Sequence, residues 1–301
     1  MPTRNWTATL SLACVGLLAA APWVSAQEAT KVAPTDLVRA VVVNEVAAAK
    51  DTNPKFMFRS LRKNQKGAQN RIYVQANETT ASMTVSENDQ PLSSQKEQAE
   101  LERLRGLANN PDQLRRRQEH EKQQMEHTLR ILKALPDAFC YEYVGTEAGQ
   151  NGSQLVHLKF KPNPAYSPPS TVEQILQGMN GDLFVDAKAR RIARIDGTLF
   201  KDVNFGWGIF GRLDKGGTFQ VQQADTGGNN WAITAMSLRL TGKILLLKSI
   251  NLTTDETFQD FRRVPDDLPF ARAVEMLESE EVRVAENVNH VRPIQVSSGS
   301  R

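Results

Sequence analysis

The sequence contains little cysteine and little net charge, and both absences narrow what the protein can be. Only two of its 301 residues are cysteines, and Cys14 lies in the N-terminal leader, so the rest of the chain cannot form an intrachain disulfide. The other, Cys140, sits in the strand pattern Phe139–Tyr143, where we expect a buried, unreactive thiol. Without residues 1–26 the chain loses one arginine and no acid, which leaves 36 basic and 34 acidic residues. It therefore has no overall field that would attract nucleic acid or an anionic membrane.

Motifs that carry catalysis or bind cofactors are also missing. There is no nucleophile elbow, no phosphate-binding loop and no Cys-x-x-Cys pair. A literal G-x-G-x-x-G occurs at Gly206–Gly211, but a strand pattern follows it and bulky side chains fill its variable positions, so a pyrophosphate has no room. His120 and His127 are seven residues apart on a charged helix, too far to share a metal ion. We expect no enzyme, no cofactor and no metal, while carboxylates paired across neighbouring strands remain an open alternative.

Residues 1–26 have the features of an export signal. An arginine stands near the start, Ala8 to Ala21 form a short apolar core, and Val24-Ser25-Ala26 is a small-residue cleavage site. The apolar run is too short, and too close to Pro22, for a membrane span. We expect cleavage after Ala26 and a periplasmic protein. An uncleaved anchor, and with it association with the membrane, is the alternative.

The stretch Gly181–Gln223 predicts antiparallel strands. Apolar or small residues alternate with polar ones from Ala193 to Phe205, which is the two-residue period of a strand with one buried face. Only turn residues separate this run from the next, Thr218–Gln222, so no crossover helix fits between them. A turn is expected at Thr241-Gly242 and a strand covered on both faces at 244–247. Further strands are expected at 55–61, 71–78, 81–86, 139–144, 154–161, 230–240, 243–252 and 256–262.

Helices are expected at both ends of the chain and in one insert. The first extends from Thr35 to Ala49, and the last covers Phe270–Glu280 before a flexible tail at 282–301. The insert, residues 93–135, is dense in Gln, Glu, Arg and Lys, and a break at Asn109-Asn110-Pro111 divides it into two helices. Its apolar positions Met125, Leu129 and Leu132 share a face that docks on the protein, and the earlier half, Leu114 to Gln124, stands in solvent.

These patterns together predict an α+β fold. A sheet of about ten strands cannot stay flat, so it should curl into an open or partial barrel. The terminal helices should cover its concave face. About 275 residues can bury one core of this size, so we expect a single domain over residues 27–281.

The aromatic stretch Phe205-Gly-Trp-Gly-Ile-Phe-Gly211 is the candidate functional element. Its glycines allow tight curvature. Its large side chains either fold back into the core at the rim of the barrel, or line or gate a lipid-sized cavity, or touch a membrane surface. Burial is favourable in each case, so energy does not decide between them. With two aromatics from neighbouring strands, the candidate ligand-lining residues are Phe205, Trp207, Ile209, Phe210, Phe219 and Trp231.

Several segments carry a resemblance to a known family. Gly181–Asp186, followed by Arg191–Gly197, resembles the paired strands of the bacterial periplasmic lipoprotein carriers of the Lol type. Pro136–Phe139, Phe205–Gly208 and the charged insert are similar to little-characterised secreted proteins of the same layout. In the carriers, helices close an incomplete barrel over an apolar cavity that shields acyl chains. The resemblance implies this architecture over residues 35–263, but it implies no individual site residue.

Two functions are therefore expected. The first is a periplasmic carrier or chaperone that binds an acyl chain, a lipoprotein or another apolar ligand on the concave face of the sheet. The alternative is a non-catalytic protein of the cell envelope that holds a protein partner through the charged helices at residues 95–130.

Overall fold

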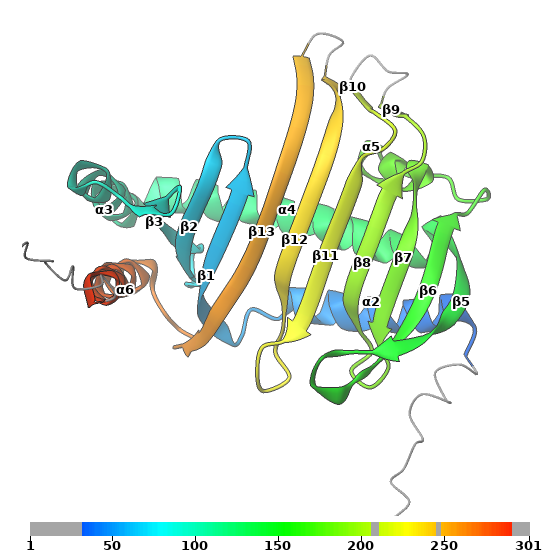
Figure 1. The fold of residues 1–301 in the computed structure, drawn as a ribbon, viewed down its shortest axis with the longest axis horizontal. Coiled ribbons are helices and arrows are strands. Elements are labelled where there is room, and N and C mark those ends of the chain that lie inside the picture. The colour runs from blue at the N-terminus through cyan, green and yellow to red at the C-terminus, as the bar shows by residue number, and fades with distance from the viewer. Residues whose placement is uncertain (1–31, 206–210, 245–247, 291–301) are drawn as a thin grey trace, which may run out of the picture.

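The computed structural model describes residues 32–205, 211–244 and 248–290, and within these ranges thirteen antiparallel strands form one sheet flanked by helices (Figure 1). The order along the sheet is β4-β3-β2-β1-β13-β12-β11-β8-β7-β6-β5, and short β9 and β10 extend it beside β12. The two end strands do not pair with each other, so the sheet is curved but open, which confirms the predicted α+β class. The strands are β1 Lys55–Asn64, β2 Gly67–Val74, β3 Ala81–Glu87, β4 Gln90–Pro91, β5 Phe139–Ala148, β6 Gln154–Pro162, β7 Met179–Asp186, β8 Arg191–Leu199, β9 Val203–Phe205, β10 Gly211–Leu213, β11 Thr218–Asp225, β12 Trp231–Ile244 and β13 Lys248–Val264. The helices are α2 Pro34–Lys50, α3 Ser94–Ala108, α4 Pro111–Ala138, α5 Thr171–Gln174 and α6 Phe270–His290, with 3₁₀ turns at Gln150–Gly152 and Ile175–Gly178.

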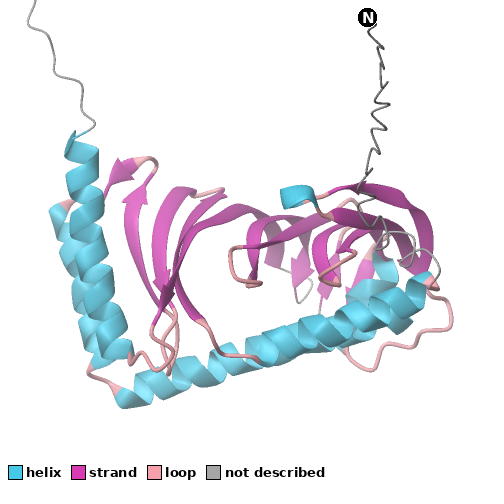
Figure 2. Cartoon of the chain, turned by 90° about the horizontal axis from the view of Figure 1, so that it is seen from below, coloured by secondary structure: helices cyan, strands magenta, loops and turns pink. Residues whose placement is uncertain are grey.

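One face of the sheet, here called the inner face, is turned toward α2 and α4. Figure 2 shows the sheet as an arch and α4 running along its open side. The valines Val38 and Val41 of α2 are buried in one core with Leu158 of β6 and Leu183 of β7. The C-terminal end of α4 adds Leu135 to this first core. Helical cover of the inner face is therefore concentrated over β5 to β8.

The opposite, outer face is covered in the other half of the sheet. Met57 of β1, Ile72 of β2 and Met83 of β3 form a second core with Leu104 of α3 and Phe270 of α6. In Figure 2, α3 and α6 stand side by side outside the arch. The expectation that the C-terminal helix covers the concave face is thus wrong, because the apolar side chains of β1, β2 and β3 point outward.

The strand register shows that these two covered faces are opposite. Directly paired residues lie on the same face of a sheet, and neighbours along a strand lie on opposite faces. Met57, in the second core, is an odd number of positions before Arg62, so the two side chains point to opposite faces. The paired residues that carry the inner face from β6 to β1 are Leu158, Leu183, Ile195, Val221, Met236, Glu256 and Arg62.

A buried carboxylate attaches α2 to the sheet. Glu45 is only 5% exposed, and its Oε1 accepts hydrogen bonds from Arg191 Nε at 2.9 Å and from the Ile192 N–H at 2.8 Å. Its Oε2 accepts a further bond from Arg191 Nη2 at 3.1 Å. Burying a charge is costly unless it is paired and hydrogen-bonded, and here both carboxylate oxygens have donors. Glu45 therefore fixes the position of α2 along β8.

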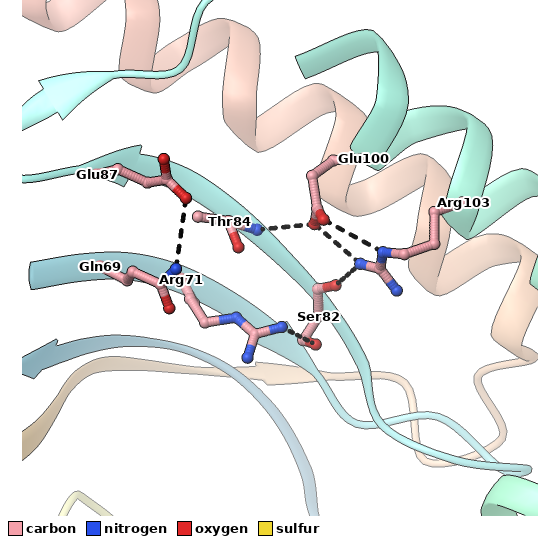
Figure 3. A network of polar contacts seen from close by, with 7 residues as sticks. All are labelled: Gln69, Arg71, Ser82, Thr84, Glu87, Glu100 and Arg103. Atoms are coloured by element: carbon pink, nitrogen blue, oxygen red, sulfur yellow. Dashed lines mark hydrogen bonds and ion pairs between the residues drawn. The ribbon is translucent and has the colours of Figure 1, made fainter. Parts of the chain in front are cut away.

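Side chains of α3 cover the exposed edge of β3. The neighbouring strand β4 has only two residues, so most of the outer backbone of β3 needs other partners. The Thr84 N–H donates to Glu100 Oε2 at 3.2 Å, and Arg103 Nη2 donates to the Ser82 carbonyl at 2.8 Å (Figure 3). Burial disfavours the charge of Glu100, but the Arg103 guanidinium and the Thr84 N–H outweigh it and hold the pKa of Glu100 below its ordinary value of 4.5.

Two predicted element boundaries between residues 230 and 262 are wrong. The residues expected to form a turn, Thr241-Gly242, are instead part of β12. The β10 backbone passes so close to Gly242 that a Cβ there would lie 2.2 Å from the Arg212 carbonyl oxygen, so this position requires glycine. The three strands expected over 230–262 are therefore two long ones, β12 and β13. Of the strand expected at 244–247, only Ile244, the last residue of β12, is described.

The helices also extend beyond their predicted ends. The last helix continues to His290, so residues 282–290 are helical where a tail was expected, since no Gly or Pro follows Phe270 until Pro293. Residues 291–301 lie outside the described range, as does the export signal at 1–26. The insert, confirmed as two helices, passes through Pro136 to Ala138. No helix in the described part of the chain is long and apolar enough to span a membrane.

The thiol of Cys140 is exposed, contrary to expectation. Cys140 lies on β5, the edge strand of the sheet, directly opposite Lys161 of β6. Its neighbours Phe139 and Tyr141 pack with the first core instead. The alternation along β5 therefore turns the thiol away from the core.

Replacing Glu45 with Ala should destabilise the protein strongly, because Arg191 would remain largely buried without its partner. Loss of one member of a buried ion pair costs about 3–5 kcal/mol. The measurement is the free energy of unfolding from urea denaturation. As a control, Arg115→Ala removes an exposed pair with Asp112 and should change stability by about 0.5 kcal/mol or less. A similar small change for Glu45→Ala would refute the role of this carboxylate in attaching α2.

Glu100→Gln should destabilise the protein by about 1–2 kcal/mol at pH 7, because a hydrogen-bonded charge at the β3 edge is lost. The pKa of Glu100 is lower in the folded protein, so its charge stabilises the fold above the ordinary pKa, and this contribution is lost as pH falls through the folded value. The difference in unfolding free energy between variant and wild type should therefore shrink below about pH 4.5. A difference that is independent of pH would contradict this assignment.

Candidate functional site

The inner face of β1, β2 and β13 has no helix packed on it comparable to α2. Its side chains point toward α4, because the apolar faces of these strands are used by the second core outside the arch. The aromatic residues on this inner face are only partly buried and belong to neither core. This part of the sheet is the candidate functional site.

Four aromatic side chains form a continuous group on this surface, named here the aromatic wall. The Phe58 ring of β1 stacks on Tyr73 of β2 at 5.2 Å between ring centroids and on Phe261 of β13 at 5.3 Å. It also meets Phe258 edge-on at 6.1 Å. All four residues are partly exposed, and none belongs to either core. Aromatic rings in contact with one another and with solvent form an apolar surface suited to binding.

A polar group borders the aromatic wall. Glu256 of β13 is 2% exposed and accepts hydrogen bonds from the Ser60 hydroxyl and from Arg62 Nε, the latter at 2.9 Å. Ser60 and Arg62 follow Phe58 on the same face of β1, at alternate positions. The inner face therefore changes from aromatic to polar along the length of β1.

The long helix α4 crosses the open side of the arch and is attached at both ends. Leu114 packs against the second core and Leu132 against the first. Between them, Glu121 bonds to Thr79 of the loop between β2 and β3. Met125 lies four residues after Glu121 and seven before Leu132, and Glu121 lies seven after Leu114. At this spacing all four residues are on the same side of α4.

The middle of α4 is not packed against the sheet. Residues 118–128 are all exposed, and Met125 is 42% exposed although it lies on the line that faces the sheet. The exposure of residues 118–124 agrees with the expectation for the first half of the helix. The expectation is wrong at Met125, which was predicted to dock with Leu129 and Leu132, and at Leu114, which packs against the second core. Met125 and the aromatic wall are therefore exposed or partly exposed apolar groups on facing elements, α4 and the inner face of β1, β2 and β13.

The residues predicted as ligand-lining do not form this surface. Phe205 and Phe219 are partly buried against the first core, and Phe219 covers Gly197, where a Cβ would lie 1.8 Å from its ring. These two side chains thus pack into the core and do not line a cavity. Trp207, Ile209 and Phe210 lie outside the described residues.

Trp231 is separate from the other predicted residues. Trp231 is the first residue of β12. Phe205 pairs with Gly211 of β10, which in turn pairs with Ile244 at the other end of β12. Trp231 and Phe205 are therefore roughly 40 Å apart, given the rise of an extended chain. The Trp231 ring faces the Arg191 guanidinium at 5.8 Å. It also borders an open pocket of about 820 Å³ whose lining includes Asp186, Lys188 and Arg194. This lining is too charged for an acyl chain.

The outer face of β6 to β8 contains the pair of carboxylates that the sequence left open. Asp182 and Asp196 are directly opposite each other on β7 and β8. Asp182 Oδ1 lies 2.7 Å from His157 Nε2, and Asp196 Oδ2 lies 3.0 Å from Arg194 Nε, so each acid has its own basic neighbour. Among the described residues, no three His, Cys, Asp or Glu side chains are grouped so that they could hold a metal ion.

A bulge explains why the sequence did not reveal the aromatic wall. Phe258 and Phe261 are three residues apart, so a regular strand would place them on opposite faces. The register shifts opposite Phe58, where Asp260 has a left-handed backbone at φ 59°, and the extra residue brings Phe261 to the face of Phe258. The only signal in the sequence was the high aromatic content of Phe56–Phe58 and Phe258–Phe261.

Truncating the aromatic wall should cost less stability than truncating the core. Phe58→Ala should lower the unfolding free energy by about 1–2 kcal/mol, because the ring is partly solvated in the folded state. Phe270→Ala, at a residue 1% exposed in the second core, should cost about 3–5 kcal/mol. Urea denaturation of the two variants gives the comparison. Equal losses would mean that Phe58 is part of a filled core.

Comparisons with known proteins reveal a structural likeness but no match in sequence. No family model matches the chain, and no curated protein matches it. Among solved structures, the chain is similar to a DUF1329 family protein from Desulfovibrio piger ATCC 29098 at 11% identity, with a TM-score of 0.27. The match covers 77% of this chain and 94% of that chain.

Proposed function

We propose that the protein is a carrier or chaperone for an apolar ligand, which binds between the aromatic wall and the middle of α4. The observation that carries this proposal is Met125. It lies on the line of α4 that faces the sheet, between two attached ends, and is still 42% exposed. On the opposite side, Phe58, Tyr73, Phe258 and Phe261 expose apolar surface that belongs to neither core.

An acyl chain suits this arrangement. Burial of apolar surface contributes about 0.8 kcal/mol for each CH₂ group, so a chain of about twelve carbons offers roughly 9 kcal/mol before the costs of association. A non-directional interaction of this kind requires a continuous apolar surface but few specific contacts. The acyl chain of a lipoprotein or of a free amphiphile would satisfy it equally.

The expected export of the chain agrees with such a role. A protein secreted into the periplasm would carry apolar molecules through an aqueous compartment, where they need to be shielded from water. The alternative role, holding a protein partner through residues 95–130, rests on the exposed polar surface of α3 and α4. The two roles differ in whether the inner face or the solvent side of α4 is used.

An uncharged ligand with a long apolar tail tests the carrier role separately from any effect of head-group charge. Wild-type protein should bind radiolabelled dodecanol in equilibrium dialysis, and Met125→Asp should weaken this binding about tenfold or more, because a charge would enter the apolar space. The matched control is Val43→Asp, a substitution at a 67% exposed residue of α2. It should leave binding unchanged.

Two results would contradict the carrier role. If the wild-type protein does not bind dodecanol, or if Val43→Asp and Met125→Asp weaken binding equally, the inner face is not a carrier site. Native mass spectrometry of protein purified from the periplasm provides a second measurement. A co-purifying lipid supports the proposal, and a bound protein lost on charge reversal within 95–130 supports the alternative.

A further inference from the structure

Arg71 of β2 lies on the inner face of the sheet and has no carboxylate partner in an ion pair among the described residues. It pairs directly with Ser60 of β1 and precedes Ile72, which is buried in the second core on the outer face. Arg71 therefore points to the inner face, beside the aromatic wall. Its side chain is partly buried, and its guanidinium carbon lies 5.5 Å from the centre of the Tyr73 ring.

The hydrogen-bonding capacity of Arg71 is mostly unused. Its Nη2 donates to the Ser82 hydroxyl at 3.1 Å (Figure 3), while its buried Nε has no hydrogen-bond partner. No carboxylate of the described residues lies within ion-pair distance of it. A guanidinium offers five donors in a planar fork, so a neutral hydroxyl and a ring face satisfy only part of it.

The acids near Arg71 are engaged elsewhere. Glu256 bonds to Ser60 and Arg62, and Glu87 pairs with Lys96. Glu100 bonds to Arg103 and the Thr84 N–H, although the charge of Arg71 also contributes to its lowered pKa. On α4, Glu121 bonds to Thr79. Arg71 therefore forms no ion pair with a described carboxylate, and Glu100, whose charge it influences, directs its hydrogen bonds to other groups.

From this we infer that Arg71 binds the anionic head group of an amphiphile whose acyl chain lies on the aromatic wall. The inference rests on the proposed carrier function and specifies its ligand class. Carboxylate and phosphate oxygens match the planar donors of a guanidinium and form its strongest hydrogen bonds. The aromatic ring of Tyr73 is two positions along the same strand, so a head group at Arg71 places the attached chain directly on the rings.

Three ligands with the same chain and different head groups test this inference. Dodecanol, dodecanoate and dodecyl phosphate, radiolabelled and below micelle-forming concentrations, are compared by equilibrium dialysis at pH 8. Wild-type protein should bind at least one of the two anions about tenfold more tightly than dodecanol. The anion with the larger preference identifies the head group.

Variants assign the preference to Arg71. Arg71→Met should remove the preference for the anion, measured as the ratio of its affinity to that of dodecanol in the same variant, while Arg71→Lys should retain part of this preference. The matched control is Arg239→Met, which removes an arginine on the outer face that pairs with Asp255. It should retain the full preference. Circular dichroism and urea denaturation of each variant show whether it is folded.

The outcomes separate this inference from the function on which it rests. Binding of dodecanol without any preference for an anion, or a preference that survives in folded Arg71→Met, overturns the role of Arg71 and leaves the carrier role intact. If none of the three ligands binds, the carrier role fails and the inference fails with it.

Discussion

The arrangement of the whole molecule depends on a change of buried face along one continuous sheet. In β5 to β8 the apolar side chains point inward to α2, and in β1 to β3 they point outward to α3 and α6. A sheet cannot be covered on both faces everywhere by so few helices, so each half leaves one face without a helix. On the outer face of β6 to β8 the uncovered surface is polar, with acids beside basic residues, whereas the inner face of β1 and β13 carries the aromatic wall.

The same change of face explains the length and composition of α4. Its 28 residues span roughly 42 Å at the rise of an α-helix, enough to connect the second core to the first across the arch. Apolar residues are needed only where it touches the cores, at Leu114 and from Leu132 onward. The stretch between them can be charged without loss of packing, because it has no neighbour to pack against. A helix that looked like a solvated insert in the sequence is thus fixed at both ends.

The sequence predicts the class of this fold well because its signals are local. Two-residue periods, the Asn151-Gly152 turn and the break at Asn110-Pro111 each depend on neighbouring residues, and the structure has a hairpin and two helices at those places. The choice of face is different, since it depends on which distant helix packs on a strand. The alternation along β1 does not show that Met57 meets α6 whereas Phe58 faces α4.

The candidate site was predicted less well for the same reason. Phe205 and Phe219 were selected for their size and their glycine neighbours, and the structure uses these two to complete the first core. The aromatic wall needs the bulge at Asp260 to bring Phe258 and Phe261 to one face, and no local pattern predicts that extra residue. Arg71 stands out only when its surroundings are known, because its distinction is the lack of an acidic partner.

The charged residues on the inner face argue against the view that this surface is meant to pack against another part of the same chain. A surface intended to pack against its own chain gains most from apolar side chains, because a buried ion pair seldom repays its desolvation. Here the buried carboxylate of Glu256 pairs with the half-exposed Arg62 next to the aromatic wall, and Arg71 adds a charge that has no ion-pair partner among the described residues. An amphiphile has an apolar chain and a charged head group. It would match a surface with aromatic rings beside charged side chains better than a purely apolar ligand or the protein's own core would. The mixture of rings and guanidinium groups on one face is therefore the feature on which the proposal of an amphiphilic ligand depends.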